Sequence, residues 1–214
     1  MIVFCRLLLL PVRTLVIVLV TPNKKKKFMV LPIYTYGQPV LRKVAADIPL
    51  DYPDLQELIR NMFETNTASD GVGLAAPQIG KSIRVVVIDL DVLSDTFPEY
   101  KNFRHAFING HILELDDSET DTMEEGCLSL PGIHESVTRA RRIHVKYLDE
   151  NLTEHDEWVD SYLARVIQHE FDHLDGRVFT DHLSAFRRQM ISGKLKALLQ
   201  GKVRCSYRVK VPRR

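Results

Sequence analysis

The chain has 214 residues, of which 45% are hydrophobic and 27% charged, a composition typical of a soluble globular protein. This length favours one well-packed domain over two. The 29 basic and 28 acidic residues nearly cancel, so the net charge of +1 points to no class of partner. The three cysteines, Cys5, Cys127 and Cys205, are too few and too widely spaced for a disulfide framework and favour a reducing compartment.

The first 28 residues differ from the rest of the chain. An apolar run over 7–20 is interrupted by Pro11 and Arg13, and four lysines follow it. Such a run is a poor membrane span and lacks the order of a secretory signal. We interpret residues 1–28 as upstream translation or a disordered extension, with Met29 as the true start and a membrane tether as the alternative. Mass spectrometry of the native N-terminus decides between them.

The patterns from Met29 onward predict an α+β domain that covers residues 29–199. Helical periodicity predicts helices over 51–68, 161–175 and 184–199, the last weakened by Gly193. β-branched or alternating segments predict strands over 83–89, 106–115, 143–148 and 155–159. Because helices and strands mix without a βαβ rhythm, we expect mixed or antiparallel sheets packed around the helix 161–175.

Charged residues are unevenly distributed. Seven of the twelve residues 114–125 are acidic, which is typical of an exposed loop. No acidic residue follows Asp181, whereas ten basic residues do. We interpret residues 200–214 as a basic tail, either a solvated terminus or a segment that rests on a polyanion such as RNA.

The segment His169-Glu170-Phe171-Asp172-His173 predicts a metal site on the helix 161–175. Imidazoles four residues apart point the same way, and Glu170 between them lies within reach of a metal-bound water. Glu170 falls inside the apolar stripe of the helix, where an unpaired carboxylate is costly and therefore indicates a nearby cation or reacting proton. The stripe consists of Leu163, Val166, Ile167, Phe171 and Leu174.

The rest of the helix has simpler interpretations. The opposite face carries Arg165, Gln168 and Asp172 and is interpreted as solvated. Asp160 or Ser161 is expected to cap the start of the helix, and Gly176 to end it.

A catalytic metal normally needs a third protein ligand and one open position. Cys127, in the turn-like segment Glu125-Gly126-Cys127-Leu128-Ser129-Leu130-Pro131, is one candidate, and the remaining histidines and carboxylates are others. A lone cysteine is usually a small buried hydrophobe, but a helix that lacks a third ligand favours thiolate ligation. The segment 71–80, GVGLAAPQIG, lets another backbone approach closely, and it lacks the endings of a phosphate-binding loop.

Taken together, GVGLAAPQIG, EGCLSLP and QHEFDH resemble the three signature motifs of the peptide deformylase family, in the same order and at similar separations. The resemblance covers about 29–199. It implies a hydrolase that removes the formyl group from the N-formylmethionine of nascent chains. Cys127, His169 and His173 would bind the metal, natively Fe²⁺ and replaceable by Zn²⁺, Ni²⁺ or Co²⁺, and Glu170 would act as general base and then as acid.

The resemblance also implies roles around the metal. The Gln78 side-chain amide and the Leu128 backbone N–H would hold the developing oxyanion, and Leu128 would also line the methionine pocket. The residues expected to bind substrate are Gly71, Val72, Gly73, Gly126 and Val166. Two positions depart from the family pattern: His134 stands where many relatives carry arginine, and Arg165 stands at a commonly apolar position.

Three alternatives remain at this point. A zincin-like peptidase would take its third ligand downstream, from Asp175, Asp181 or His182, and a degenerate binding protein would lack a catalytic residue. The basic tail alone suggests RNA binding, but ribosome contact by a deformylase is the simpler hypothesis. We expect formylated nascent peptides as partners, no DNA and no stable membrane insertion, in a bacterial cytoplasm or an organellar matrix or stroma.

Overall fold

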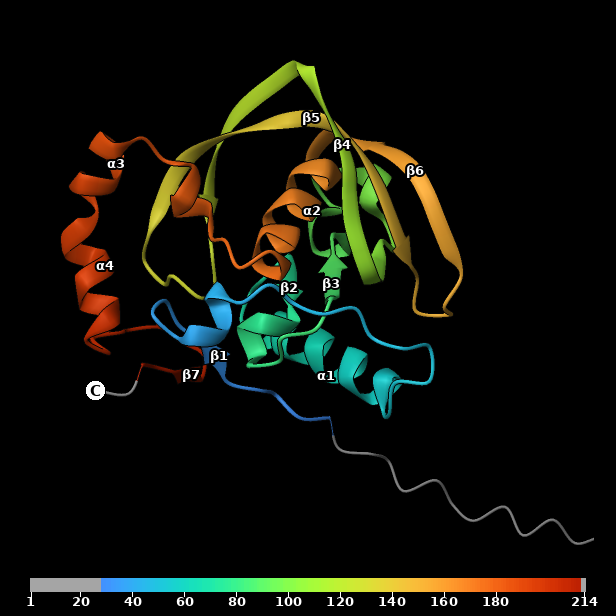
Figure 1. Ribbon diagram of the computed structural model, residues 1–214, viewed down its shortest axis with the longest axis horizontal. Helices are drawn as coiled ribbons and strands as arrows, with labels where there is room; N and C mark the ends of the chain where they lie inside the picture. Colours follow the sequence, from blue (N-terminus) through green and yellow to red (C-terminus); the bar gives the residue numbers. More distant parts are fainter. Residues whose placement is uncertain (1–27, 213–214) are drawn as a thin grey trace, which may run out of the picture.

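The computed structural model describes residues 28–212. Its α-helices and β-strands follow one another in an order without a repeated βαβ unit, as Figure 1 shows. Their bounds are β1 Ile33–Tyr34, α1 Leu55–Ala68, β2 Gly73–Ala75, β3 Val85–Asp89, β4 Arg104–Gly126, β5 His134–Leu148, β6 Glu154–Asp160, α2 Ser161–Leu174, α3 Ala185–Met190, α4 Ser192–Leu199 and β7 Val209–Lys210. Short 3-10 helices are η1 Pro39–Arg42, η2 Ala76–Ile79, η3 Asp91–Leu93, η4 Pro98–Tyr100 and η5 Phe179–His182.

The strands form one five-stranded sheet and one small pair. The sheet has the order β2-β3-β4-β5-β6 and is antiparallel throughout, whereas β1 and β7 pair in parallel. Three register shifts between β4 and β5 bend these long strands, which arch over α2 (Figure 1). The architecture is α+β, as predicted, with α2 at its centre.

The acidic segment 114–125 is a strand and not the exposed loop that we predicted. It continues β4 and pairs with the basic part of β5, so that Asp116 lies opposite Arg142 and Asp121 opposite Arg139. Opposite charges across an antiparallel pair favour this pairing, which replaces the missing apolar alternation as the reason for strand formation. For the same reason β5 begins at His134, nine residues before the predicted start.

Two predicted helices have different bounds. The helix predicted over 51–68 begins at Leu55, because Asp54 adopts a left-handed conformation with φ of 56°, and Pro53 therefore precedes the helix. The helix predicted over 184–199 is two helices, which meet at Ile191, and Gly193 lies within the second of them. The strand predicted over 83–89 and the antiparallel return over 155–159 are confirmed by β3 and β6.

The span of α2 agrees with the predicted helix. Of its two faces, the apolar stripe is buried as predicted, whereas the opposite face is not solvated. The apolar stripe packs into a core with β3 and β5. The opposite face is not solvated: Arg165 is 4% exposed and Gln168 6%. Gln168 donates to the carbonyl of Ala140 on β5, so the polar face is covered by the sheet. Asp160 occupies the N-cap position, but its side chain makes no capping hydrogen bond.

Residues 1–27 lie outside the described part of the chain, and with them nearly all of the predicted extension. Within residues 28–212, no helix combines the length and the apolar character that a membrane span requires. A second core joins α1 to the other face of β3, and a third joins α4 to the turn after β4. The central helix is therefore held between the sheet and the connections that follow it.

A substitution at Gly110 tests the close packing between β4 and α2. A Cβ at Gly110 would lie 2.3 Å from Phe171 Cζ, whereas a Cβ at Gly193 on α4 would meet no atom of the described residues within 4 Å. We expect Gly110→Ala to lower the free energy of unfolding by about 1–3 kcal/mol, because the buried ring must shift. Gly193→Ala should raise it by up to about 1 kcal/mol through helix propensity. Urea denaturation measures both, and equal stability of the two variants would contradict the packing argument.

Candidate metal centre and active site

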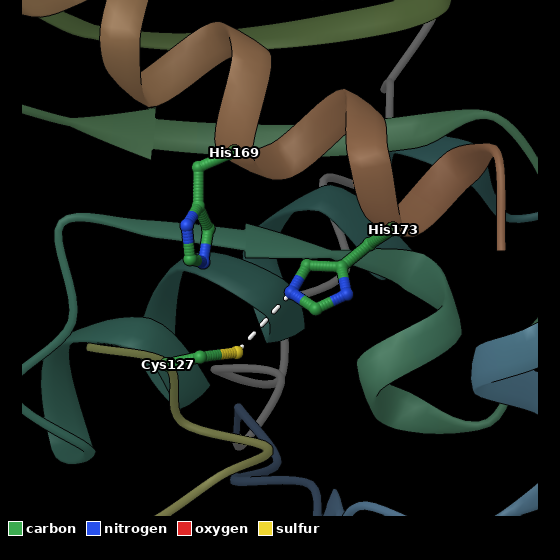
Figure 2. A group of neighbouring side chains, drawn as sticks. All are labelled: Cys127, His169 and His173. Carbon is green, nitrogen blue, oxygen red and sulfur yellow. Dashed lines mark hydrogen bonds between the residues drawn. The ribbon is translucent and has the colours of Figure 1, made fainter. Parts of the chain in front are cut away.

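Three side chains that can bind a metal meet beside α2. Cys127 directly follows β4, and His169 and His173 lie one turn apart on the helix. One donor atom of each lies within 4.8 Å of the other two, and Cys127 Sγ is 3.2 Å from His173 Nε2 (Figure 2). The structure therefore brings together the three residues expected from the sequence.

The donors fit a divalent transition metal. Burial raises the pKa of the Cys127 thiol, but the positive charge of His173 and hydrogen bonds from both histidines outweigh burial and lower this pKa to about 5. The thiol therefore ionises readily, as a ligand must. A thiolate and two imidazoles suit zinc or iron, and three protein donors leave the fourth position of a tetrahedral site for water.

Glu125 fixes the orientation of one ligand. Its Oε2 accepts a hydrogen bond of 2.9 Å from His169 Nδ1, which leaves Nε2 of that ring to face the centre. Burial raises the pKa of Glu125, but hydrogen bonds from His169 and Arg139 outweigh burial and hold this pKa far below its usual range. Glu125 therefore remains a carboxylate and makes His169 a stronger ligand.

Two buried arginines compensate the charge of Glu125. Arg139 on β5 contacts both carboxylate oxygens, at 2.6 and 2.9 Å, and Arg165 on α2 donates to Oε1 at 2.6 Å. Arg139 also donates to Asp172 on α2 at 2.9 Å. The polar face of α2 is thus the face through which the helix is joined to β4 and β5, which explains why it is not exposed.

Glu170 lies in a different electrostatic environment. It is 3% exposed, and its Oε2 is buried without a hydrogen-bond partner among residues 28–212. Burial raises its pKa to about 7, against the opposing charges of His169 and His173. A Cβ at Gly73 on β2 would lie 2.5 Å from Glu170 Oε1, so only glycine at that position leaves space for this carboxylate.

Gln78 and Leu128 flank the centre. The Ala75 N–H donates to Gln78 Oε1 at 2.8 Å, which directs Nε2 toward Cys127 Sγ at 3.5 Å and Ser129 Oγ at 3.3 Å. Gln78 comes from η2, the short helix that directly follows β2. Leu128 follows the cysteine and is partly buried. Gln78 therefore presents its amide beside Cys127, and Leu128 adjoins this cysteine in the chain.

A cleft of about 430 Å³ opens beside these residues. Gln78, Leu128, His169 and Glu170 line it together with all five residues expected to bind substrate, Gly71, Val72, Gly73, Gly126 and Val166. β2 is an edge strand of the five-stranded sheet. His134 also lines the cleft, with its ring close to the Cα of Gly126. The cleft therefore lies beside both the candidate metal donors and an open strand edge.

Comparison with known proteins decides the family. The model of the polypeptide deformylase family matches residues 30–189. A peptide deformylase of Flavobacterium psychrophilum is 44% identical over 190 residues, covering 86% of this chain and 97% of the relative. The chain belongs to the peptide deformylase family.

Solved structures agree with this assignment. A peptide deformylase from Legionella pneumophila aligns with a TM-score of 0.70 at 36% identity, over 82% of this chain and 99% of that one. A peptide deformylase from Ehrlichia chaffeensis, solved in complex with actinonin, aligns with a TM-score of 0.70 at 32% identity. The alignment covers 82% of this chain and 99% of that one. The enzyme is accordingly a hydrolase that removes the formyl group from N-formylmethionine, the reaction of this family.

The downstream ligands of a zincin-like peptidase are engaged elsewhere in the enzyme. Asp175 pairs with Arg84 at 2.8 Å, Asp181 with Arg188 at 2.6 Å and His182 with Asp172 at 2.8 Å. These bonds hold the segment after α2 against the rest of the fold. Among the described residues, the third donor that lies with His169 and His173 is therefore upstream, at Cys127.

Sequence reasoning missed several residues of the site. Glu125 could have been noticed, because an acid two residues before a candidate ligand is a natural partner for a ligating histidine. Arg139 gives no such signal, since its contact depends on the pairing of β4 with β5. The segment from Arg204 to Tyr207 also lines the cleft, although residues 200–214 were interpreted as a basic tail. There β7 pairs with β1 and returns the chain to the site.

Glu125→Gln tests how the buried carboxylate supports the metal. We expect a loss of metal affinity of about 10–100-fold, because the variant lacks the charge that orients His169 and strengthens it as a ligand. Competition with a chelator measures this affinity. Glu119→Gln is the control, because its partner Arg141 lies on the exposed surface. Equal affinities of the two variants would show that Glu125 serves folding alone.

Proposed function

We propose that Cys127, His169 and His173 bind one Fe²⁺ ion, for which Zn²⁺, Ni²⁺ or Co²⁺ can substitute, and that deformylation takes place in the adjoining cleft. The observation that carries this proposal is the convergence of the three donors with a buried, unpartnered carboxylate. A pKa near 7 suits Glu170 to both accept and return a proton at neutral pH. A degenerate binding protein would not retain such a group.

Glu170, Gln78 and Leu128 have different roles in the reaction. The metal, when bound, acidifies a water molecule and polarises the formyl carbonyl. Glu170 accepts the proton of the attacking water and donates it to the leaving nitrogen, so the C–N bond breaks to give formate and a free amine. The Gln78 side-chain amide and the Leu128 N–H donate to the oxygen on which negative charge develops.

The cleft accounts for the choice of substrate. An extended peptide can add to the free edge of β2, beside Gly73 and the residues Gly71 and Val72 that precede the strand, with main-chain hydrogen bonds that any sequence provides. Val72, Leu128 and Val166 line the cleft and offer an apolar surface to the methionine side chain. Because Glu170 lies directly against Gly73, the reacting centre is cramped. It accepts a formyl hydrogen and excludes an acetyl methyl group.

Formate release from formyl-Met-Ala-Ser by Fe²⁺ protein prepared without oxygen tests the mechanism. We expect Gln78→Ala to lower kcat by about two to three decades, because one oxyanion donor in a dry site contributes about 3–4 kcal/mol. Glu170→Ala should lower kcat further than Gln78→Ala does, because Glu170 serves both proton transfers.

Acetyl-Met-Ala-Ser and Gln56→Ala are the controls for this measurement. Gln56 is exposed and donates to the Glu150 carbonyl on another part of the surface, so its removal should leave kcat unchanged. Glu170→Ala protein that keeps its metal and full activity would contradict the proposed role, and release of acetate would contradict the proposed selectivity.

The substrate also indicates where the enzyme acts. Formylated nascent chains arise where translation starts with formylmethionine, so the proposed location is a bacterial cytoplasm or an organellar matrix or stroma. The relatives in Flavobacterium, Cytophaga and Salinibacter are bacterial. Their occurrence supports the bacterial alternative.

Contact with the ribosome is proposed for the basic C-terminal region. Lys194 and Lys196 on α4 and Lys202 beyond it are exposed, and the described residues offer them no acidic partner. Three lysines close together in the chain suit the phosphates of ribosomal RNA, whereas Arg187 and Arg188 are paired with carboxylates.

Co-sedimentation with ribosomes tests this contact. We expect replacement of all three lysines by glutamine to weaken association, and added salt to weaken that of the unmodified protein, because released counterions drive the binding. Replacement of Lys43, Arg60 and Lys101 by glutamine removes the same charge elsewhere and should have little effect. Association that is insensitive to salt would contradict the proposal.

A further inference from the structure

The C-terminal segment Arg204–Tyr207 forms part of the wall of the active-site cleft. It is held there by β7, whose register with β1 places Ile33 opposite Val209. The Ile33 N–H donates to the Arg208 carbonyl at 2.9 Å, and Gln38 Nε2 donates to the Val211 carbonyl at 2.7 Å. Figure 1 shows β7 beside β1, at the end of the chain that follows α4. The segment is therefore anchored immediately beyond the residues that face the site.

Tyr207 connects this segment to the turn that carries the metal ligand. Its hydroxyl donates a hydrogen bond of 2.8 Å to the Leu128 carbonyl, and its ring packs, like Leu128, against the core between α1 and β3. The carbonyls on either side are also engaged: Cys127 O accepts from Leu130 N at 2.9 Å, and Ser129 O accepts from Tyr36 N at 2.8 Å. Three consecutive carbonyls of the turn thus have donors, and the one on Leu128 depends on Tyr207.

We propose that Tyr207 is a positioning residue for the reaction, and that its bond to the Leu128 carbonyl aims the Leu128 N–H at the oxyanion. This inference rests on the proposed role of Leu128. A donor contributes to the rate only when it is held where charge develops, so a fixed backbone is required. Because the hydroxyl already donates its proton to the carbonyl, Tyr207 acts through Leu128 and gives no proton to the substrate.

The decisive variant is Tyr207→Phe, which removes the hydroxyl and keeps the ring. Deformylation of formyl-Met-Ala-Ser by metal-loaded protein should show kcat per bound metal lowered by about tenfold, the effect of one net hydrogen bond. KM should change by less than about twofold, because the bond acts on the developing charge and not on the bound peptide. The melting temperature should stay close to that of the unmodified protein.

Tyr147→Phe is the matched control. Its hydroxyl donates a 3.0 Å hydrogen bond to Glu157, outside the cleft, so its loss should leave kcat unchanged. A kcat per metal in Tyr207→Phe that equals that of the control would overturn the proposal. So would a fall in activity that only follows a fall in metal content or in melting temperature, because Tyr207 would then serve the metal or the fold.

Hydrogen exchange of the Leu128 amide, followed by NMR on zinc-loaded protein, separates this inference from the proposed function. We expect faster exchange in Tyr207→Phe than in Tyr147→Phe, because the turn loses one of its three fixed carbonyls. The measurement needs no turnover. If the unmodified protein released no formate, the mechanism under Proposed function would fail, while the exchange rates would still decide whether Tyr207 holds Leu128; unchanged exchange would overturn that role.

Discussion

The arrangement of the site depends on the hydrogen bonds that the buried Glu125 carboxylate accepts. It lies at the end of β4, two residues before Cys127, and accepts hydrogen bonds from Arg139, Arg165 and His169. These donors come from β5 and α2, so one side chain joins the strand that leads to the thiolate to the helix that carries both imidazoles. A buried ion pair adds little net stability, but removal of one partner leaves an uncompensated charge and is costly. The network therefore specifies one arrangement of strand and helix, and this arrangement is the one that brings the three ligands together.

The pKa values of two buried carboxylates near the candidate metal donors are shifted in opposite directions by their neighbours. Glu125 is surrounded by donors and has a strongly lowered pKa, whereas Glu170 lies against Gly73 with one oxygen unpartnered and has a pKa raised to about 7. The first is fixed as an anion that supports a ligand. The second can exchange a proton near neutrality, which a general base and acid must do. The same functional group is thus held ionised in one place and suited to proton exchange in the other, and the difference lies in the contacts around it.

Local patterns in the sequence were sufficient for the metal helix, because a spacing of four residues places His169 and His173 on one face whatever surrounds them. They were insufficient for the other face of the helix. Arg165 reads as solvated until its partners on β4 are known, and these lie 40 or more residues away in the chain. The prediction of a loop over 114–125 was wrong for the same reason, because the pairing of this part of β4 depends on charges of β5. Tyr207 gave no signal, because a two-residue strand such as β7 has no periodicity and forms only where β1 offers an edge.

The pairing of β1 with β7 connects both ends of the described chain to the centre of the enzyme. From the β1 side, Tyr36 N donates to the Ser129 carbonyl, and from the β7 side, the Tyr207 hydroxyl donates to the Leu128 carbonyl. Cys127 belongs to the same turn, so the candidate metal donor and the contacts from the two-stranded sheet lie on one short segment. Constraints on the same segment reinforce each other, because ordering by one lowers the entropy that the other must overcome. The described C-terminal segment thereby lines the cleft and contacts the same turn that carries Cys127.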